Sequence, residues 1–423
     1  EIGSGLVGSE MCIRDSIWCC YFLRHVSLSL LTVTKHYQQL LLIHAPLPIL
    51  LFCLFKNNKV QHTCQSNCMK SSTIYYDIIP LGGSKMNDYI INFLKEIMAI
   101  DSPSGYTKEV IHHCQKEAEN LGFHTHQTNK GNLEIYVEGQ DDYTIGFCGH
   151  VDTLGLMVRS IKSDGTLAFT NVGGPIIPTL DGEYCRIHTR SGKCYTGTIL
   201  SNYPAVHVYK DAKSAPRDCE NMHVRIDEVV KNKEDVQALG IQNGDYIAYD
   251  PKTEITASGF IKSRFLDDKM SVAILFGMLK HLANNHIKPK HNLIIIISTY
   301  EEVGHGSSYI HPDIDELIAV DMGCIGEDLA CSEYDVSICA KDGSGPYDYD
   351  LTSKLIELAS THQLQYAIDI YPYYSSDVSA ALRGGQNIKG ALIGPGVAAS
   401  HGMERTHLQA VENTLKLLLA YIA

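Results

Sequence analysis

The sequence has 423 residues, 44% of them hydrophobic, and a chain of this size can build a large core in two or three domains. Its 48 acidic residues outnumber its 35 basic residues, which gives a formal net charge of −13, and it has no sustained cluster of lysine or arginine. This balance argues against nucleic acid and anionic membranes as partners, and it suits a metal-binding site.

The first 85 residues differ in sequence pattern from the rest of the chain. They include an apolar stretch at residues 40–55, which is 16 residues long and is interrupted by two prolines and a histidine. A membrane span needs about 20 residues, and the usual order of signal-peptide features is missing. We therefore interpret residues 1–85 as an N-terminal extension, disordered or artefactual, with a weak membrane anchor as the alternative.

The 14 cysteines show no regular framework. Most of them stand singly inside apolar runs, as Cys148 and Cys339 do, which is typical of reduced thiols in a cytoplasmic protein. The segment HTCQSNC, near residue 64, is only a weak match to a zinc-binding motif.

From Asn87 onward the pattern is that of an α/β protein. Apolar residues recur at helical spacing between residues 87 and 100, behind Asn87 as the expected N-cap. These apolar residues are Ile90, Phe93, Leu94, Ile97 and Met98. A second helix is expected from about Thr107 to Gly122.

Short alternating stretches with frequent turn signals then occupy residues 158–257, which predicts a small β-barrel-like domain inserted into the α/β domain. The catalytic α/β domain would comprise residues 86–157 and 258–423, with a nearly all-apolar, buried helix at residues 265–285. Further elements are expected at residues 293–300, 316–321, 351–361 and 364–371. The predicted fold is a mixed, largely parallel sheet flanked by helices.

Acidic and imidazole side chains stand at the carboxyl ends of several apolar runs. Glu301 and Glu302 follow one predicted strand, and His150 and Asp321 end two others. In a doubly wound sheet, ligands bind in the crevice outside these strand ends, so we expect the four side chains to converge there.

Two further segments are expected to reach the same crevice. Asp267 and Asp268 lie where the inserted module returns to the core, and His401 lies in a loop ahead of the last helix. Carboxylates brought together repel one another and are driven toward protonation unless cations lie among them. One ion would leave several carboxylates uncompensated, so the sequence predicts two.

The motifs GHVD, FLDDK, YEEVG, IAVD and SHGMERTH resemble, in order and spacing, those of the M42 family of metallo-aminopeptidases. The resemblance extends from about residue 86 to the C-terminus and includes the inserted module. It implies a dinuclear site in which Asp267 bridges both ions. His150 and Asp321 would complete the protein ligands of one ion, and Glu302 and His401 those of the other.

The resemblance also assigns roles to residues that do not bind metal. Glu301 would be the general base for the catalytic water. Asp152 would orient the His150 imidazole, and the peptide bond between Asp267 and Asp268 is expected to be cis.

Four neighbouring residues stay open at this point. His407 is the runner-up to His401 as the last ligand, because the family commonly has a different loop sequence there. His305 and His311 lie near the predicted base, and a loop or substrate-contact role is preferred over metal binding for both. Asp377 is either a neighbour of the site or a helix cap.

The implied function is aminopeptidase activity on short peptides, with zinc, cobalt or manganese as the cofactor. The same site could instead serve an amidohydrolase or deacylase of a small N-acyl compound, and a non-catalytic assembly protein is a third reading. The family resemblance further implies a homo-oligomer, commonly of twelve subunits, while the cytoplasmic location is expected from the cysteine pattern.

Overall fold

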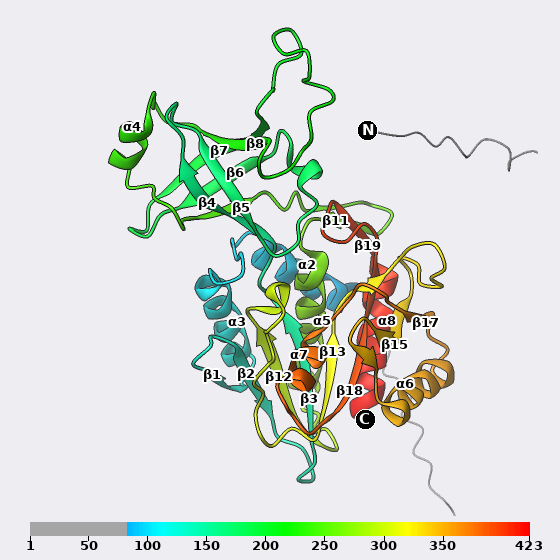
Figure 1. Ribbon diagram of the computed structural model, residues 1–423. Helices are drawn as coiled ribbons and strands as arrows, with labels where there is room; N and C mark the ends of the chain where they lie inside the picture. The colour runs from blue at the N-terminus through cyan, green and yellow to red at the C-terminus, as the bar shows by residue number, and fades with distance from the viewer. Residues whose placement is uncertain (1–82) are drawn as a thin grey trace, which may run out of the picture. The chain divides into compact units, whose positions relative to one another are not determined.

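The central element of the fold is a mixed sheet. The computed structural model describes residues 83–423. Ten strands pair in the order β1-β2-β12-β3-β13-β18-β15-β16, with β14 beside β18 and β17 beside β15 (Figure 1). Their bounds are β1 His124–Gln127, β2 Leu133–Val137, β3 Thr144–His150, β12 Asn292–Ser298, β13 Glu316–Val320, β14 Gly323–Cys324, β15 Val336–Asp342, β16 Gly345–Pro346, β17 Tyr366–Ile370 and β18 Lys389–Val397.

The middle of the sheet is parallel and apolar on both faces. β12, β3, β13 and β18 run parallel to one another, whereas β2 and β15 flank them in antiparallel pairs. Alternate residues of β3 pack into different cores, with Ile145 and Phe147 in the larger core and Cys148 in the smaller one. Burial of both faces explains why these strands read as continuous apolar runs in the sequence.

Helices cover both faces of the sheet. Their bounds are α2 Gly83–Met98, α3 Lys108–Asn120, α5 Leu266–Asn285, α6 Tyr349–Thr361, α7 Asp377–Arg383 and α8 Leu408–Ile422. α5 is buried along almost its whole length and packs against α2, α8 and β3. α7 packs on β13 and β18, and its Val378 belongs to the smaller core. The predicted mixed, largely parallel sheet flanked by helices is confirmed.

A closed barrel interrupts the chain between β3 and α5. Its strands pair in the order β4-β5-β8-β7-β6-β9, and Figure 1 shows the barrel apart from the large sheet. The bounds are β4 Gly155–Ile161, β5 Leu167–Val172, β6 Tyr184–His188, β7 Cys194–Ser201, β8 Met222–Ile226 and β9 Tyr246–Tyr249, with α4 at Lys233–Ala238 and the short 3-10 helix η1 at Ile177–Leu180. Leu156, Phe169 and Ile247 are among its fully buried core residues. The predicted barrel-like insertion is present, while the domain boundaries at residues 158 and 257 stay predictions.

A small sheet joins the return from the barrel to the last loop of the chain. It pairs β10 (Glu254–Ile255) with β11 (Phe260–Ser263), and β11 with β19 (Glu404–His407). This pairing brings the segment around His401 close to the start of α5.

One local prediction is wrong. Asn87 was expected to cap the first helix, but α2 begins at Gly83, so Asn87 lies inside it and its side-chain amide donates to Glu412 at 2.6 Å. The second helix begins after Thr107 as expected, and Gly122 follows its end with φ of +91°.

The predictions made for residues 1–82, including the apolar stretch and the HTCQSNC segment, lie outside the described residues. Between residues 83 and 423, no helix combines the length and the apolar character needed to span a membrane.

Candidate metal centre

The candidate site forms where three parallel strands end. β3 ends at His150, which lies opposite Ser298, the last residue of β12. β12 leads into the short 3-10 helix η2 (Glu301–Val303), which begins with the two adjacent glutamates, and β13 is followed directly by Asp321. Because the carboxyl ends of parallel strands meet at one edge of the sheet, side chains distant in sequence are brought together.

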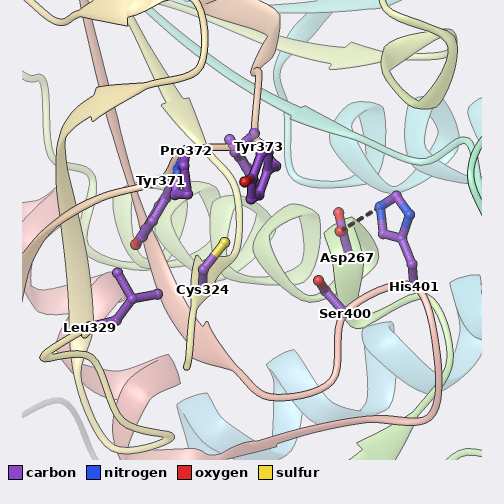
Figure 2. Close-up of a pocket in the computed structure, with 9 residues that line it drawn as sticks. Asp267, Cys324, Leu329, Tyr371, Pro372, Tyr373, Ser400 and His401 are labelled. Atoms are coloured by element: carbon purple, nitrogen blue, oxygen red, sulfur yellow. Dashed lines mark ion pairs between the residues drawn. The ribbon is translucent and has the colours of Figure 1, made fainter. Parts of the chain in front are cut away.

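Two further carboxylates come from the start of α5. Asp267 and Asp268 have non-helical backbone angles, and the peptide bond between them is cis, which confirms that prediction. Asp267 Oδ1 lies 3.2 Å from His150 Nε2, and Asp267 Oδ2 lies 3.6 Å from His401 Nε2, a contact visible in Figure 2. One carboxylate therefore faces two imidazoles.

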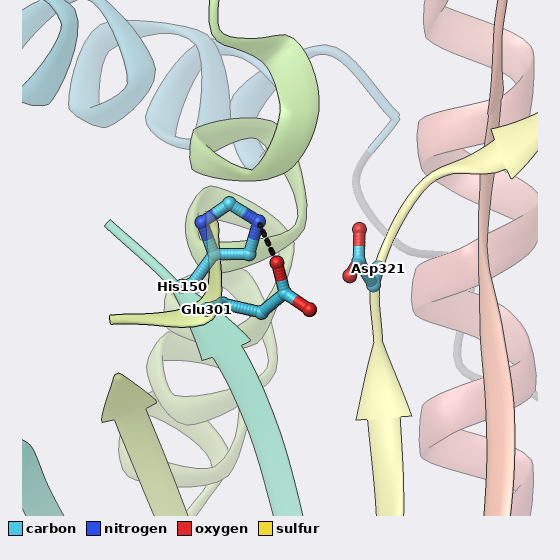
Figure 3. Close-up of side chains that lie close together, drawn as sticks. All are labelled: His150, Glu301 and Asp321. Carbon is cyan, nitrogen blue, oxygen red and sulfur yellow. Dashed lines mark ion pairs between the residues drawn. The ribbon is translucent and has the colours of Figure 1, made fainter. Parts of the chain in front are cut away.

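Potential ligand atoms converge in two groups that share His150. Atoms of His150, Asp267 and Glu302 lie within 4.8 Å of one another, and so do atoms of His150, Glu301 and Asp321. Figure 3 shows the second group, in which Glu301 Oε2 is 3.9 Å from His150 Nε2. The fold thus gathers into one cluster residues that are up to 171 positions apart, from His150 to Asp321.

His401 lies in the loop before β19, beside the first group. Its Nε2 is 3.7 Å from Glu302 Oε2, and its Nδ1 is 2.9 Å from the carbonyl oxygen of Gly174, which fixes the ring. His407 lies elsewhere, as the N-cap of α8, and its Nδ1 accepts a hydrogen bond from the backbone of Gln409. Of the two histidines considered for the last ligand, the fold brings His401 to the cluster.

Asp152 is fully buried and connects β3 to η2. Its carboxylate accepts hydrogen bonds from the backbone N–H groups of Glu301 at 3.1 Å and Glu302 at 3.3 Å, and from the Ser104 hydroxyl at 2.5 Å. Its closest contact with His150 is through its main-chain oxygen, 2.9 Å from Nδ1, whereas its Oδ1 is 3.6 Å away. This carbonyl favours a proton on Nδ1, which leaves Nε2 free to bind a metal.

Glu404 links two candidate ligands that are distant in sequence. Its buried carboxylate accepts hydrogen bonds from the backbone N–H groups of Asp267 at 3.1 Å and His401 at 3.0 Å. His401 and Ala399 both have positive φ, 63° and 60°, so this loop adopts a left-handed conformation at non-glycine residues. The role of Glu404 could not be predicted from the sequence, because its spacing from His401 carries no signal of this double contact.

Burial and mutual repulsion disfavour charge on most of these carboxylates. Burial, followed by repulsion from Asp267, raises the pKa of Asp321 to about 7. Burial also raises the pKa values of Glu301 and Glu302 well above their usual range. For Asp267, burial is outweighed by the hydrogen bond from His150 and by the charge of His401, so its pKa is lowered. Without added cations the cluster cannot hold its full negative charge.

The side chains present fit divalent cations. The buried oxygen Oε1 of Glu302 has no hydrogen-bond partner among the described residues, and neither has Oδ1 of Asp268. Such atoms cost free energy unless something pairs with them. A donor set of carboxylate oxygens and imidazole nitrogens suits zinc, cobalt or manganese.

The other residues considered from the sequence lie near the site without joining its two groups. The His305 ring stacks on Tyr300, and the His311 ring packs edge-on against Tyr136. Asp377 is the first residue of α7, and its carboxylate accepts hydrogen bonds from the end of β12 and from the loop after η2. Asp377 thus supports the segment that carries the two glutamates.

Comparison with known proteins gives this geometry a context. Residues 131–417 match the family described as M42 glutamyl aminopeptidase. YhfE of Bacillus subtilis (strain 168), a proposed aminopeptidase, is 47% identical over 334 residues, which cover 78% of this chain and 96% of that protein. The glutamyl aminopeptidase of Lactococcus lactis subsp. cremoris (strain MG1363) is 25% identical over 214 residues, which cover 50% of this chain and 59% of that enzyme.

Solved structures share the fold. The TET aminopeptidase of the marine sediment archaeon Thaumarchaeota archaeon SCGC AB-539-E09 has a TM-score of 0.72 at 19% identity, over 79% of this chain and 96% of that one. The TET1 peptidase of Pyrococcus horikoshii, which can assemble into a tetrahedron or a large octahedral shell, has a TM-score of 0.69 at 24% identity, over 79% and 99% of the two chains. Since the family match spans both parts of the α/β domain and the barrel, and a relative is nearly half identical along almost its whole length, the chain belongs to the M42 family and is an aminopeptidase.

Proposed function

We propose that this aminopeptidase uses two divalent cations to remove N-terminal residues from short peptides. The observation that carries the proposal is the position of Asp267, whose two oxygens each face a different imidazole, at 3.2 Å and 3.6 Å. Asp267 would bridge the ions, with His150 and Asp321 completing the ligands of one ion and Glu302 and His401 those of the other.

The charges of the cluster support two ions over one. The unpartnered oxygen of Glu302 and the raised pKa values of three carboxylates indicate missing positive charge on both sides of Asp267. When bound, two divalent ions supply Lewis-acid polarisation of the scissile carbonyl and a water whose pKa falls from 15.7 to about 7. Zinc is the proposed ion, and cobalt and manganese also accept these ligands.

Glu301 is the proposed general base. Its carboxylate would take the proton of the attacking water and return it to the leaving amine, a role worth about 10²- to 10⁴-fold in rate. Asp152 supports this position by accepting the backbone N–H of Glu301. Glu301 also lies close to His150 and Asp321, and the metal content of a Glu301 variant distinguishes a base from a ligand.

The Glu301→Gln variant tests the assignment. We expect turnover of an aminoacyl anilide to fall about 10²- to 10⁴-fold while metal analysis still finds two ions per chain. The matched variant Glu302→Gln should lose both activity and bound metal. Turnover like that of the wild type in Glu301→Gln would contradict the base, and loss of an ion there would make Glu301 a ligand instead.

Substrate class, assembly and location follow as parts of the same proposal. Hydrolysis of aminoacyl anilides but not of N-acetyl amino acids would support a peptidase over a deacylase with this site. The dodecamer and the larger shells named for TET1 structures support a homo-oligomer, with twelve subunits as the proposed number. Light scattering that found only monomers would contradict this. The cysteines within residues 83–423 are free thiols, which supports a cytoplasmic location.

A further inference from the structure

A cavity of about 330 Å³ opens directly beside the candidate metal centre. Asp267 and His401, two of the proposed ligands, form part of its lining together with Ser400. Figure 2 shows Leu329, Tyr371 and Cys324 on the side away from Asp267 and His401. The volume is at the lower end of the range of small-molecule sites, about 300–1,000 Å³, which suits one amino-acid residue better than an extended ligand.

The wall away from the proposed ligands is apolar in character. Leu329 and Pro372 contribute hydrocarbon surface, and the Tyr371 hydroxyl is already hydrogen-bonded to Ser337, so Tyr371 offers mainly its ring. Cys324 adds a small, weakly polar thiol to this wall. Tyr373 and Tyr374 also line the cavity and add rings with uncharged hydroxyls. The cavity therefore has a polar end at the metal centre, and the rest of its described lining is uncharged and largely apolar.

Among the described residues that line the cavity, none is a lysine or an arginine, and Asp267 is the one carboxylate. Basic residues on nearby strands are engaged elsewhere, since Lys341 Nζ donates to the carbonyl oxygen of Asp342 at 2.8 Å and Arg405 pairs with Glu333. A charged side chain placed in this part of the cavity would lose hydration without gaining a partner of opposite charge, which is unfavourable. An apolar side chain would gain free energy by leaving water.

We propose that this cavity receives the side chain of the substrate's N-terminal residue and selects uncharged, apolar side chains, an inference that rests on the proposed function. Leucine, methionine and phenylalanine would be preferred over glutamate, aspartate and lysine. The family description names glutamate, but none of the described residues that line this cavity is a lysine or an arginine that could pair with a glutamate side chain.

The first experiment compares p-nitroanilides of leucine, phenylalanine, alanine, glutamate and lysine as substrates of the full, zinc-loaded chain. We expect kcat/KM for the leucine or phenylalanine compound to exceed that for the glutamate and lysine compounds at least about tenfold. A preference for glutamate or lysine would overturn the selectivity while leaving the aminopeptidase intact. Hydrolysis of N-acetyl amino acids alone would overturn the proposed function, and this inference with it.

The second experiment places a cation in the apolar wall. Leu329→Lys should raise the ratio of glutamate to leucine turnover at least about tenfold, whereas Leu329→Ala should lower leucine turnover without that gain. Ile368→Lys is the matched control, because it adds the same charge on an exposed position of β17 outside the cavity lining. Turnover of the alanine compound reports whether each variant folds. An unchanged ratio in Leu329→Lys, or an equal change in Ile368→Lys, would overturn the proposal.

Discussion

The metal centre contains buried aspartates, and the junction between the α/β domain and the barrel, where Asp101 meets β6, contains a partly buried one. Their surroundings have opposite effects on the charge. At the metal centre, burial and the charge of Asp267 raise the pKa of Asp321 to about 7. At the junction, burial also opposes the charge of Asp101, yet hydrogen bonds from His188 and Arg186 lower its pKa to about 2. The junction has its own cations, whereas the metal centre has too few, so its balance must come from ions outside the chain.

The largest expected effect comes from removing the shared carboxylate of the metal centre. Asp267→Asn takes away the group that faces both imidazoles, so we expect metal affinity to fall more than about 100-fold and activity to be lost with it. Metal content after dialysis and turnover of an aminoacyl anilide measure this directly.

Asp245→Asn is the matched control for that variant. Asp245 is equally buried, but it lies in the barrel, where its carboxylate accepts backbone hydrogen bonds. The Asp245→Asn variant should keep both ions, even if it is less stable than the wild type. Full metal content in Asp267→Asn would contradict the contrast between the two regions.

A smaller effect is expected where a carboxylate positions ligands without binding an ion. Glu404→Gln keeps the shape of the side chain but weakens its hydrogen bonds to the backbone of Asp267 and His401. We expect metal affinity to fall about 10- to 100-fold, as for other groups that orient ligands, with activity restored by excess metal. Competition with a chelator measures the affinity.

Glu333→Gln tests whether that effect is specific. Glu333 pairs with Arg405, the residue after Glu404, and within the part of the chain that the structure describes it forms no hydrogen bond or ion pair with a proposed ligand. Its variant should therefore bind metal like the wild type. Equal losses in Glu333→Gln and Glu404→Gln would mean that the loop is disturbed in general, and that Glu404 has no special role.

The sequence predicts the strand-end part of the site because that part follows from local patterns. A continuous apolar run marks a strand buried on both faces, and a polar residue at its end marks the edge of the sheet, which is how His150 and Asp321 could be found. The order of the strands could not be predicted in this way, because β12 lies between β2 and β3 through long-range pairing that no local pattern specifies.

Contacts made by backbone groups and by distant loops escaped prediction for the same reason. The carbonyl oxygen of Gly174 holds the His401 ring across 227 positions, and Glu404 reaches Asp267 across 137. Neither contact changes the spacing of any motif. The predicted N-cap at Asn87 is wrong for a local reason. The helix begins upstream at Gly83 and passes through residues that carry no apolar repeat, so the sequence pattern does not show its start.

The smallest expected effect tests the junction, where the chain compensates its own charge. The Asp101 side chain is 14% exposed, and Asp101→Asn removes the ion pair with Arg186 and weakens the hydrogen bond with His188. Folding lowers the pKa of Asp101 from 3.8 to about 2. The charged carboxylate therefore stabilises the folded state at pH values above the unfolded-state pKa, and this stability is lost as the pH falls through the folded-state pKa. The variant should therefore be less stable than the wild type by about 2 kcal/mol at pH 7 and by roughly half of that at pH 3.

Urea unfolding at the two pH values measures this difference in stability. Glu220→Gln is the control, because it breaks an exposed ion pair with Arg159 and should change the stability little at either pH. A deficit in Asp101→Asn that stayed constant with pH would mean that packing, and not the charge of Asp101, stabilises the junction.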